Sequence, residues 1–354
     1  MSNQYMMTGY PGFIAGLLFR ALAERDPSAS FVFLVHPSQL EKARELTEAE
    51  ERVRLLVGDI TREDLGLPAE ELPGLRESIT HFFHLAAIYD LAVPRDAAYA
   101  VNVTGTEQVN RFVGTLNHLK RYIYFSTAYV SGDRTGIVKE DELDCGQGFK
   151  NHYESTKFEA EKRVAALRDV PCTILRPGVV VGDSQTGETV KFDGPYFVMR
   201  FLDGMRNLPV PYVGKGNNPF NIVPVDYILK ATVWLAHSEK GANRTFHLTD
   251  PSPYTAREVY RMICEELRGK APSYSIPGKV ADGLMAIRPV RKFFDVERES
   301  ISYMSEQSEY DCSQAVSVLE EGGIHCPDLA SYLPKLVRYY KEHREDPDKK
   351  IPIR

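Results

Sequence analysis

Short apolar runs alternate with helix-length stretches through the first half of the chain, and this rhythm constrains the fold more than any other feature. Such alternation predicts parallel strands joined by helical crossovers. Gln4–Thr8 is the first expected strand, and apolar residues at helical spacing then predict a helix over Gly12–Arg25. The other expected strands are Phe31–Val35, Arg52–Val57, Thr80–Leu85, Arg121–Phe125, Cys172–Leu175 and Arg244–Leu248, and the other expected helices are Gln39–Glu51, Ala97–Leu116, Tyr153–Leu167 and Phe197–Arg206.

The pattern changes after Gly182, where Gly-, Asp-, Pro- and Asn-rich loops begin. A chain of 354 residues is long enough for one large domain and a smaller one. We therefore expect an α/β fold with a Rossmann-type, doubly wound parallel sheet and a smaller, mainly helical C-terminal substrate-binding cap. The expected Rossmann domain covers residues 1–182, with 222–248 returning to it, and the expected cap covers 183–221 and 249–354.

Composition excludes several other classes of protein. The formal net charge of −6 gives no basic footprint for nucleic acid. No apolar run approaches the roughly 20 residues of a membrane helix, and no basic-then-apolar segment marks a secretory signal, so we expect a cytoplasmic protein without a membrane segment. The five cysteines lie far apart without metal-ligand spacing, which predicts reduced thiols and no metal site. The sequence leaves the oligomeric state open, a dimer included.

A glycine-rich turn lies between the first expected strand and the first expected helix. Gly9 permits a tight turn, Gly12 lets the backbone approach a phosphate, and small residues at Ala15 and Gly16 allow the helix to lie close to the sheet. The spacing is Gly-x-x-Gly-x-x-Ala, a variant of the common dinucleotide pattern, and a plain strand-to-helix turn is the alternative. The expected cofactor contacts here are Thr8, Gly9, Tyr10, Pro11, Gly12, Phe13 and Ile14.

The residues after the second and third strands bear on the choice of cofactor. Val35-His36-Pro37-Ser38 lacks the acid that would bind the ribose of NAD, so the sequence favours NADP (NADPH), with NAD as the alternative. His36, Ser38 or Lys42 could contact the 2′-phosphate, although His36 could equally be a solvated loop residue. Asp59, followed by Ile60, could accept a hydrogen bond from adenine or cap its own turn.

Tyr153 and Lys157 are four residues apart and share one face of an expected helix. A neighbouring ammonium would lower the pKa of the phenol and make it a better proton donor to a developing alkoxide. Lys157 could also hold the nicotinamide ribose. Thr127, at the end of the fifth strand, could orient the substrate oxygen, with Ser126 as the competing choice. Alone, a Tyr-x-x-x-Lys pair occurs often by chance, and an ordinary surface pair is the alternative.

Together these motifs resemble an extended short-chain dehydrogenase/reductase. The segments that carry the resemblance are Thr8–Gly16, Gly58-Asp59, His84–Ala87, Asn102–Thr106, Ser126–Gly132, Tyr153–Lys157 and Arg176–Gly178. The resemblance implies an enzyme that transfers hydride with a Tyr acid/base, a Lys partner and a Ser/Thr oxygen anchor, which fall on Tyr153, Lys157 and Thr127. It also implies cofactor contacts from Leu85, Ala86, Ala87, Asn102, Pro177, Gly178 and Val180.

Val181–Gly187 and Asn221–Ile228 are similar to the thioester-reductase and fatty-acyl-CoA-reductase branch of that superfamily. This branch implies reduction of an acyl thioester, on CoA or an acyl carrier protein, to an aldehyde or alcohol in lipid metabolism. The alternatives are an NADP-dependent ketone, aldehyde or 3-oxoacyl reductase, a sugar-nucleotide epimerase or dehydratase, and a noncatalytic NADP-binding regulator, which the intact Tyr153/Lys157 pair disfavours.

Candidate substrate contacts follow from the same branch. Aromatic and apolar residues in the expected cap could line an acyl channel, although a simple core would need the same residues. The candidates near the site are Tyr89, Ser126, Phe192 and Tyr196, and the further apolar candidates are Phe197, Met199, Phe201, Leu284, Met285, Ile287, Phe293 and Phe294.

Overall fold

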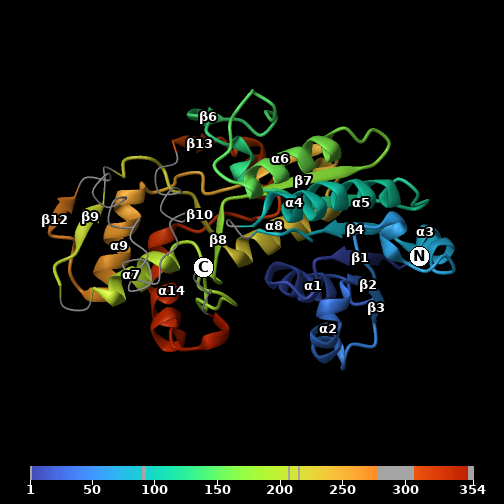
Figure 1. The fold of residues 1–354 in the computed structure, drawn as a ribbon, viewed down its shortest axis with the longest axis horizontal. Coiled ribbons are helices and arrows are strands. Elements are labelled where there is room, and N and C mark those ends of the chain that lie inside the picture. Colours follow the sequence, from blue (N-terminus) through green and yellow to red (C-terminus); the bar gives the residue numbers. More distant parts are fainter. Residues whose placement is uncertain (1, 90–92, 206–207, 214–215, 277–306, 350–354) are drawn as a thin grey trace.

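A seven-stranded sheet forms the larger part of the protein, with strand order β11-β7-β5-β4-β1-β2-β3 and every neighbouring pair parallel (Figure 1). The computed structural model describes residues 2–89, 93–205, 208–213, 216–276 and 307–349. This order confirms the Rossmann-type, doubly wound sheet, whose switch point lies between β1 and β4. The strands are β1 (Gln4–Thr8), β2 (Ser30–Val35), β3 (Val53–Val57), β4 (His81–His84), β5 (Arg121–Phe125), β7 (Cys172–Pro177) and β11 (Arg244–Leu248).

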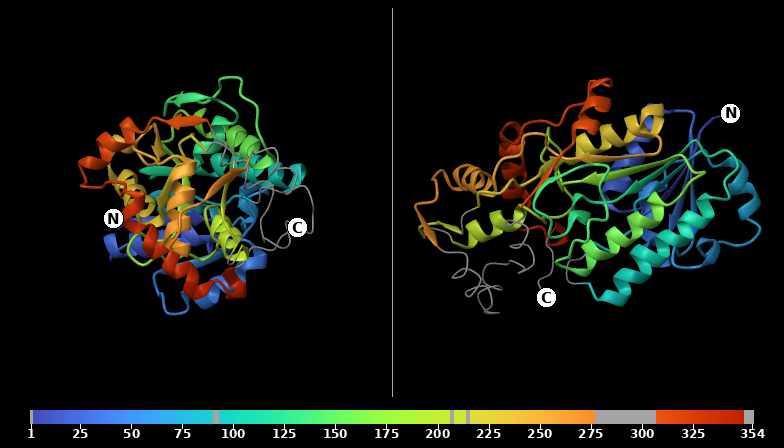
Figure 2. Two further views of the ribbon diagram at one scale, coloured as in Figure 1. Left: turned by 90° about the vertical axis from the view of Figure 1, so that its left-hand side faces the viewer. Right: turned by 90° about the horizontal axis from the view of Figure 1, so that it is seen from above.

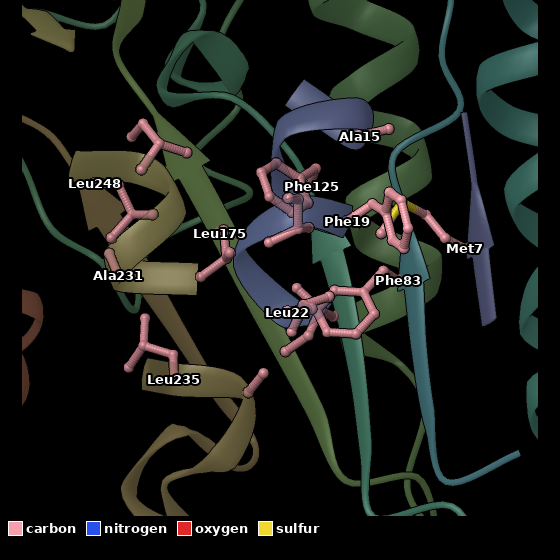
Figure 3. Packing of buried hydrophobic residues seen from close by; sticks show 14 of the residues in the cluster. Met7, Ala15, Phe19, Leu22, Phe83, Phe125, Leu175, Ala231, Leu235 and Leu248 are labelled. Atoms are coloured by element: carbon pink, nitrogen blue, oxygen red, sulfur yellow. The ribbon is translucent and has the colours of Figure 1, made fainter. Parts of the chain in front are cut away.

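Helices cover both faces of the sheet, and each face has its own apolar core. On one face, Phe19 and Leu22 of the first helix pack with Phe83, Leu175 and other strand residues, as Figure 3 shows. Because the inner strands of the sheet are buried on both sides, they consist of near-continuous apolar runs, whereas the edge strand β3 has exposed residues. The first face carries α1 (Phe13–Arg25), α2 (Leu40–Thr47), α8 (Val225–His237) and α13 (Ser313–Glu320), and the second carries α3 (Leu72–Ser78), α5 (Gly105–Val113) and α6 (His152–Ala165).

Two local expectations differ from the structure. The helix expected over Ala97–Leu116 is divided into α4 (Arg95–Ala98), a π-helical turn over Tyr99–Thr104, and α5. π-Turns are rare and are frequent at functional sites. The break expected at Arg176 is delayed, because Arg176 and Pro177 still pair with β11.

A second group of elements forms the cap, at the left of Figure 1 and, in other orientations, in Figure 2. Its helices pack around a third apolar core of aromatic and aliphatic side chains. Two short parallel pairs, β8–β10 and β9–β12, accompany them, and a third pair joins β6 to β13. The cap elements are α7 (Tyr196–Gly204), α9 (Ala256–Arg268), α14 (Leu329–His343), β9 (Pro211–Val213) and β12 (Tyr274–Ile276). The pair of β8 (Val179–Val181) with β10 (Ile222–Pro224) lies in the middle of Figure 1, and the pair of β6 (Gly136–Val138) with β13 (Ser308–Tyr310) lies at its top.

One segment departs from the expected division into domains. We expected all of residues 249–354 in the cap, but Ala315, Val318 and Leu319 of α13 join the core that α1 and α8 share. The reason is that the first face of the sheet still has apolar surface beside α8 to cover. Among the described residues, no helix combines the length and the apolar character needed to cross a bilayer.

Candidate active site at the carboxyl edge of the sheet

The glycine turn lies where β1 ends and runs close to the loop after β4. Gly9 has a φ of +89°, and a Cβ atom there would lie 2.8 Å from the Ala86 nitrogen. A Cβ on Gly12 would lie 2.7 Å from the Gly9 oxygen. Both positions therefore require glycine, and the turn forms a backbone cradle that a side chain would fill.

The N-terminus of α1 opens directly onto this cradle. Gly12 is its N-cap residue, no side chain caps it, and its first turn contains no acidic residue. The N–H groups and the positive end of the helix dipole are thus free to receive an anion, and the cradle fits the pyrophosphate of a dinucleotide. By contrast, Asn151 caps α6 by accepting a hydrogen bond from the Glu154 N–H.

Not every residue of the turn faces the cradle. The Tyr10 ring is buried and stacks on Phe33 with 4.3 Å between ring centroids, so only its backbone borders the turn. Ala15 is buried in the core beneath the helix, as expected for close helix–sheet contact. A Cβ on Gly16 would meet nothing within 4 Å, so our expectation that this glycine brings the helix close to the sheet is wrong.

Polar groups after β2 and β3 form the expected adenosine end. The His36 Nδ1 accepts a hydrogen bond from the Ser38 N–H at 3.3 Å and lies 2.8 Å from the Ser38 hydroxyl, and both residues are exposed. Asp59 accepts from the N–H and the hydroxyl of Thr61, which makes it the cap of its own turn. Burial tends to raise the pKa of Asp59, but the Thr61 hydrogen bonds and the charges of His36 and Arg62 hold it below its usual value.

Arg62 was missed by the sequence reasoning, and it lies at the same place. Its Nε is 3.7 Å from an Asp59 carboxylate oxygen, and its side chain is largely exposed. A basic residue three positions after Asp59 was the available signal. The Ile60 side chain packs against the second core, so it supports this loop from beneath.

Tyr153 and Thr127 meet from two different elements. Thr127 follows β5 and is buried, and Tyr153 lies in the first turn of α6 with part of its surface exposed. Burial raises the pKa of Tyr153 to about 12, a hydrogen bond with the Thr127 side chain opposes the rise, and the charges of Glu154 and Tyr89 add to it. The phenol is therefore protonated at neutral pH and can serve as a proton donor.

Lys157 is buried one turn further along α6. Its Nζ donates to the Phe125 carbonyl oxygen at 2.5 Å and to the Tyr124 hydroxyl at 3.0 Å. Burial lowers the pKa of Lys157 to about 7, and the Glu161 carboxylate opposes this. An ammonium has three N–H donors, so these two bonds leave one for a ribose hydroxyl.

This arrangement corrects one expectation about the pair. We expected Lys157 to lower the pKa of Tyr153, but in the protein alone that pKa is raised, because burial dominates and the lysine is bonded to Tyr124 and Phe125.

Ser126, the competing oxygen anchor, is directed into the interior. Its hydroxyl donates a hydrogen bond to Glu161, and Glu161 is paired with Arg176 at 2.6 Å, with all three side chains buried. The Ser126 proton is thus committed to a buried carboxylate. This leaves Thr127 as the hydroxyl beside Tyr153 and gives no support to Ser126 as a substrate contact.

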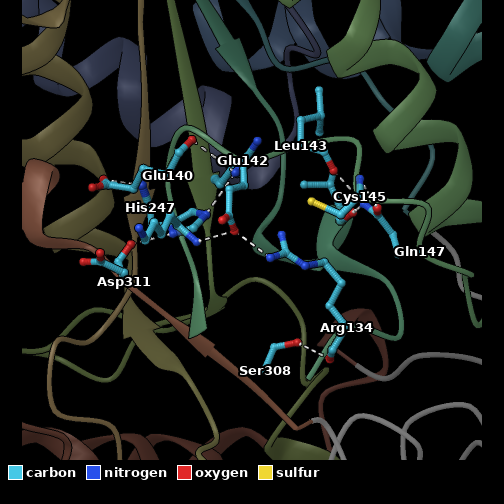
Figure 4. Close-up of polar contacts among 12 residues, drawn as sticks. Arg134, Glu140, Glu142, Leu143, Cys145, Gln147, His247, Ser308 and Asp311 are labelled. Carbon is cyan, nitrogen blue, oxygen red and sulfur yellow. Dashed lines mark hydrogen bonds and ion pairs between the residues drawn. The ribbon is translucent and has the colours of Figure 1, made fainter. Parts of the chain in front are cut away.

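Through Arg176, the buried pair continues into a polar network beneath the edge of the sheet, of which Figure 4 shows Glu140, His247 and Asp311. Arg176 Nη1 lies 3.1 Å from His247 Nε2, and the His247 Nδ1 lies 2.7 Å from the Asp311 carbonyl oxygen. The Glu140 carboxylate accepts from the N–H groups of His247, Gln314 and Ala315. Burial raises the pKa of Glu140 to about 7, against these hydrogen bonds. The network joins β11 and α13 to the site.

The remaining expected cofactor residues lie in the loop after β4, in the π-turn, at the end of β7 and in β8. Asn102, in the π-turn, donates to the Ile88 carbonyl and to Thr156 and accepts from the Ile88 N–H, so it ties the loop after β4 to α6. Leu85, Ala86 and Ala87 are half-buried in that loop, Pro177 ends β7, Gly178 bonds Leu248 through its N–H, and Val180 lies in β8.

The expected substrate residues separate into two groups. Tyr89 is 51% exposed, and its hydroxyl accepts from Lys191 Nζ at 3.2 Å, which links the loop after β4 to the segment before α7. Phe192 and Tyr196 are 0% and 1% exposed and contact each other in the cap core. Their burial matches the alternative of a simple core and does not support an open channel. Met199 and Phe201 pack in or against the same core, and Phe197 is buried with the Arg200 guanidinium 5.6 Å from its ring centroid. Leu284, Met285, Ile287, Phe293 and Phe294 lie outside the described residues.

A parallel sheet in this order, with a glycine turn at its switch point and a Tyr-Lys pair beside β5, defines an extended short-chain dehydrogenase/reductase, an NAD(P)-dependent enzyme. The family model described as "Male sterility protein", NAD_binding_4, matches residues 7–232, more than half of the chain. The chain therefore belongs to this family of thioester-reductase-like oxidoreductases.

Named relatives agree with this assignment. A linear gramicidin synthase protein of Brevibacillus parabrevis is 28% identical over 269 residues, covering 70% of this chain and 5% of the synthase protein. A putative fatty acyl-CoA reductase of Drosophila melanogaster is 22% identical over 287 residues, covering 64% of this chain and 50% of the reductase. The terminal R domain from the myxalamid PKS-NRPS biosynthetic pathway superposes with a TM-score of 0.79 at 25% identity, over 99% of this chain and 93% of the domain. The chain thus spans half or less of these two curated relatives.

Proposed function

We propose that the protein reduces an acyl thioester, carried on CoA or on a carrier protein, to the aldehyde with NADPH. The observation that carries this proposal is the contact between Thr127 and Tyr153 at the end of β5, with Lys157 one helical turn further along α6 and the glycine cradle at the same edge of the sheet. Support for the thioester comes from the relatives, which include a fatty acyl-CoA reductase and a terminal reductase domain. When bound, NADPH would supply the hydride.

The chain's own groups act on the oxygen of the thioester. The Tyr153 phenol and the Thr127 hydroxyl would both donate to the carbonyl oxygen, so they stabilise the negative charge that develops as hydride reaches the carbon. The carbon–sulfur bond then breaks, the carbonyl re-forms as an aldehyde, and the thiolate leaves and takes up a proton. Acyl thioester, NADPH and one proton thus yield aldehyde, thiol and NADP⁺.

Lys157 has a holding role in this proposal. Its Nζ is fixed by Tyr124 and Phe125, with one N–H donor left for the nicotinamide ribose. One helical turn from the phenol, the ammonium would also add positive potential near the reacting oxygen. Both roles depend on a charged lysine.

NADPH is the proposed cofactor because of the groups after β2 and β3. No acidic residue that would repel a 2′-phosphate directly follows β2 among the described residues. His36 and Ser38 are exposed after β2, and Arg62 is exposed after β3. A phosphate could accept from the His36 ring, the Ser38 hydroxyl and the Arg62 guanidinium. Asp59 neutralises part of the Arg62 charge, so a moderate preference is expected.

The substrate is tested by NADPH oxidation with acyl-CoAs of graded length and with the same acyl groups on a phosphopantetheinylated carrier protein. Aldehyde and free thiol appearing in equal amounts would support the proposal. Turnover of aldehydes or ketones together with inertness toward every thioester would overturn it and favour the simple carbonyl reductase.

Cofactor choice is tested by dissociation constants for NADPH and NADH. Replacing both His36 and Ser38 by Ala should weaken NADPH binding about tenfold, the value of one lost charge-assisted contact, and leave NADH binding unchanged. His118→Ala, which removes an exposed histidine paired with Glu77 elsewhere, is the matched control. Equal loss for both cofactors, or tighter NADH binding by the unmodified protein, would contradict the assignment.

A further inference from the structure

Two tyrosines of β5 are nearly identical in burial and differ in one contact. Tyr122 and Tyr124 are 0% and 1% exposed and contribute to the same core. The Tyr122 hydroxyl donates to Asn110 Oδ1 at 3.0 Å. The Tyr124 hydroxyl instead accepts from Lys157 Nζ at 3.0 Å, and that nitrogen lies 4.4 Å from the Tyr124 ring centroid.

A chain of buried polar groups lies behind Tyr124. The His84 ring packs against the Tyr124 ring with 5.6 Å between centroids, and the Thr106 hydroxyl donates to the Asn102 carbonyl at 2.7 Å. His84 Nε2 is 3.0 Å from the Thr106 oxygen, and His84 Nδ1 is 2.7 Å from the Thr8 hydroxyl. The Thr8 oxygen also accepts from the Ala86 N–H.

The hydrogen positions in this chain follow from the number of donors. Thr106 has one proton and gives it to Asn102, so its oxygen must accept from His84 Nε2. His84 Nδ1 is then an acceptor for the Thr8 proton, and the ring is neutral. Burial lowers the pKa of His84 to about 3, in agreement. Lys157 Nζ is the donor to Tyr124, so the Tyr124 hydroxyl presents a lone pair to the ammonium.

We propose that Tyr124 is a positioning residue that holds the Lys157 ammonium at the active site through its hydroxyl. The His84 ring packs beside Tyr124, and its hydrogen bonds to Thr106 and Thr8 connect this position to the cofactor turn. This inference rests on the role of Lys157 in the proposed function. It adds a residue that neither the Tyr-x-x-x-Lys spacing nor the hydroxyl after β5 indicates.

The groups around Lys157 determine how its protonation, and with it the pH dependence of kcat, should change when Tyr124 is replaced. Glu161 on α6 favours the ammonium, while burial and any charge on His84 of β4 oppose it. Tyr124 and Phe125 of β5 supply the two acceptors. Removing the Tyr124 acceptor therefore makes the charged lysine less stable, and Lys157 loses its proton at lower pH.

The experiment compares Tyr124→Phe, Tyr122→Phe and Lys157→Ala in NADPH oxidation between pH 5.5 and 9, with octanoyl-CoA and, separately, octanal. In Tyr124→Phe we expect kcat to fall about tenfold above neutral pH, its alkaline limb to move about one pH unit lower, and KM for the acyl substrate to stay within about twofold. Tyr122→Phe should lower the melting temperature about as much as Tyr124→Phe does, and the alkaline limb of its kcat–pH profile should coincide with that of the wild type.

The inference would be overturned if the alkaline limb of the kcat–pH profile were the same in Tyr124→Phe as in the wild type. It would also be overturned if Tyr122→Phe moved that limb by the same amount as Tyr124→Phe. Thr106→Val, which removes the acceptor of the His84 proton and retains the side-chain volume, should loosen the ring that packs on Tyr124 and move the alkaline limb in the same direction by less. This second variant decides the question if Tyr124→Phe does not fold, and an unmoved limb in it would then count against the proposal.

Failure of the inference is distinguishable from failure of the proposed function. Full activity of Lys157→Ala would reject the role of the lysine itself. Loss of activity in Lys157→Ala with an unmoved limb in Tyr124→Phe would reject Tyr124 alone. Octanal reduction without octanoyl-CoA reduction would reject the thioester and still permit the Tyr124 comparison.

Discussion

The carboxyl edge of the sheet and the cap bury their side chains equally well but hold them by different forces. At the edge, Thr8, His84 and Lys157 are fixed by hydrogen bonds between strands, loops and α6. In the cap, Phe192 and Tyr340 are fixed by ring contacts, with centroids 5.1 Å apart. Buried polar groups hold hydrogen-bond donors and acceptors in fixed directions, so that they can bind a ligand. An aromatic core contributes only packing and stability. Substitutions should therefore separate activity from stability between the two regions.

Tyr153→Phe should give the largest effect on activity. Loss of the proton donor should lower kcat by about 10²–10⁴-fold, the usual contribution of a general acid. Thermal stability and NADPH affinity should change little, because the aromatic ring remains in place and the lost hydroxyl is proposed to bind the substrate oxygen. Steady-state kinetics, thermal melts and NADPH titration measure the three quantities.

Tyr99→Phe is the matched control for this change. Tyr99 is 44% exposed in the π-turn, and its hydroxyl meets only Arg163 at 3.5 Å among the described contacts. It should keep wild-type turnover. Unchanged turnover in Tyr153→Phe would refute the catalytic assignment and, with it, the functional half of the comparison.

Phe192→Ala should show the opposite behaviour in the cap. Removing a fully buried ring destabilises a protein by about 3–5 kcal/mol, so denaturant melts should shift strongly. At a temperature where the variant is folded, KM for acyl-CoAs of different length should stay close to the wild-type values. Tyr274→Ala, at an exposed position in β12, is the control and should change stability little.

A change in chain-length preference in Phe192→Ala without loss of stability would contradict this prediction. It would mean that the ring lines an acyl channel, as the sequence first indicated, and that the cap contributes to recognition directly.

The same contrast explains what could be predicted from the sequence. The ranges expected for β1 and β5 match the structure, because each is an apolar run bounded by turn residues and buried on both faces. The Tyr153–Lys157 helix follows from spacing along one element. These features are local, so a pattern in the chain contains them.

The features that were missed depend on contacts between distant segments. β6 pairs with β13 across about 170 residues, and each has only three residues, too few for a periodic pattern. Tyr124, Glu161 and Arg176 act through partners on other elements, and nothing beside them in the sequence distinguishes Tyr124 from Tyr122. Phe192 was assigned to a channel because composition cannot separate a lining residue from a core residue.

Glu140 gives a smaller, pH-dependent test beneath the edge of the sheet. Its pKa is raised to about 7 in the folded protein, so between its unfolded pKa near 4.5 and pH 7 only the folded state holds the proton. Stability should therefore decrease as pH rises through this window, at most by roughly 1.4 kcal/mol per pH unit. Urea melts of the wild type and of Glu140→Gln from pH 4.5 to 8 measure this slope.

In Glu140→Gln this contribution to the slope should be absent, because the amide does not titrate. Glu142→Gln is the control, since that carboxylate pairs with Arg134 near the surface and its pKa is lowered instead. A slope that persists in Glu140→Gln would show that the network beneath the sheet is not proton-linked through this residue.

Thr255→Ala should give the smallest effect on stability among these substitutions. It tests the difference between the N-termini of α9 and α1. Thr255 and Glu258 form a capping box that satisfies the first turn of α9 within the helix itself, whereas the first turn of α1 has no side-chain cap. The substitution should cost about 1 kcal/mol, and Thr255→Ser should restore most of it. Because the open start of α1 is the one that fits a phosphate, saturating NADPH should raise the melting temperature of Thr255→Ala and of the wild type by the same amount. A smaller rise in Thr255→Ala would mean that the start of α9 also responds to the cofactor, and that the cap is coupled to the edge of the sheet.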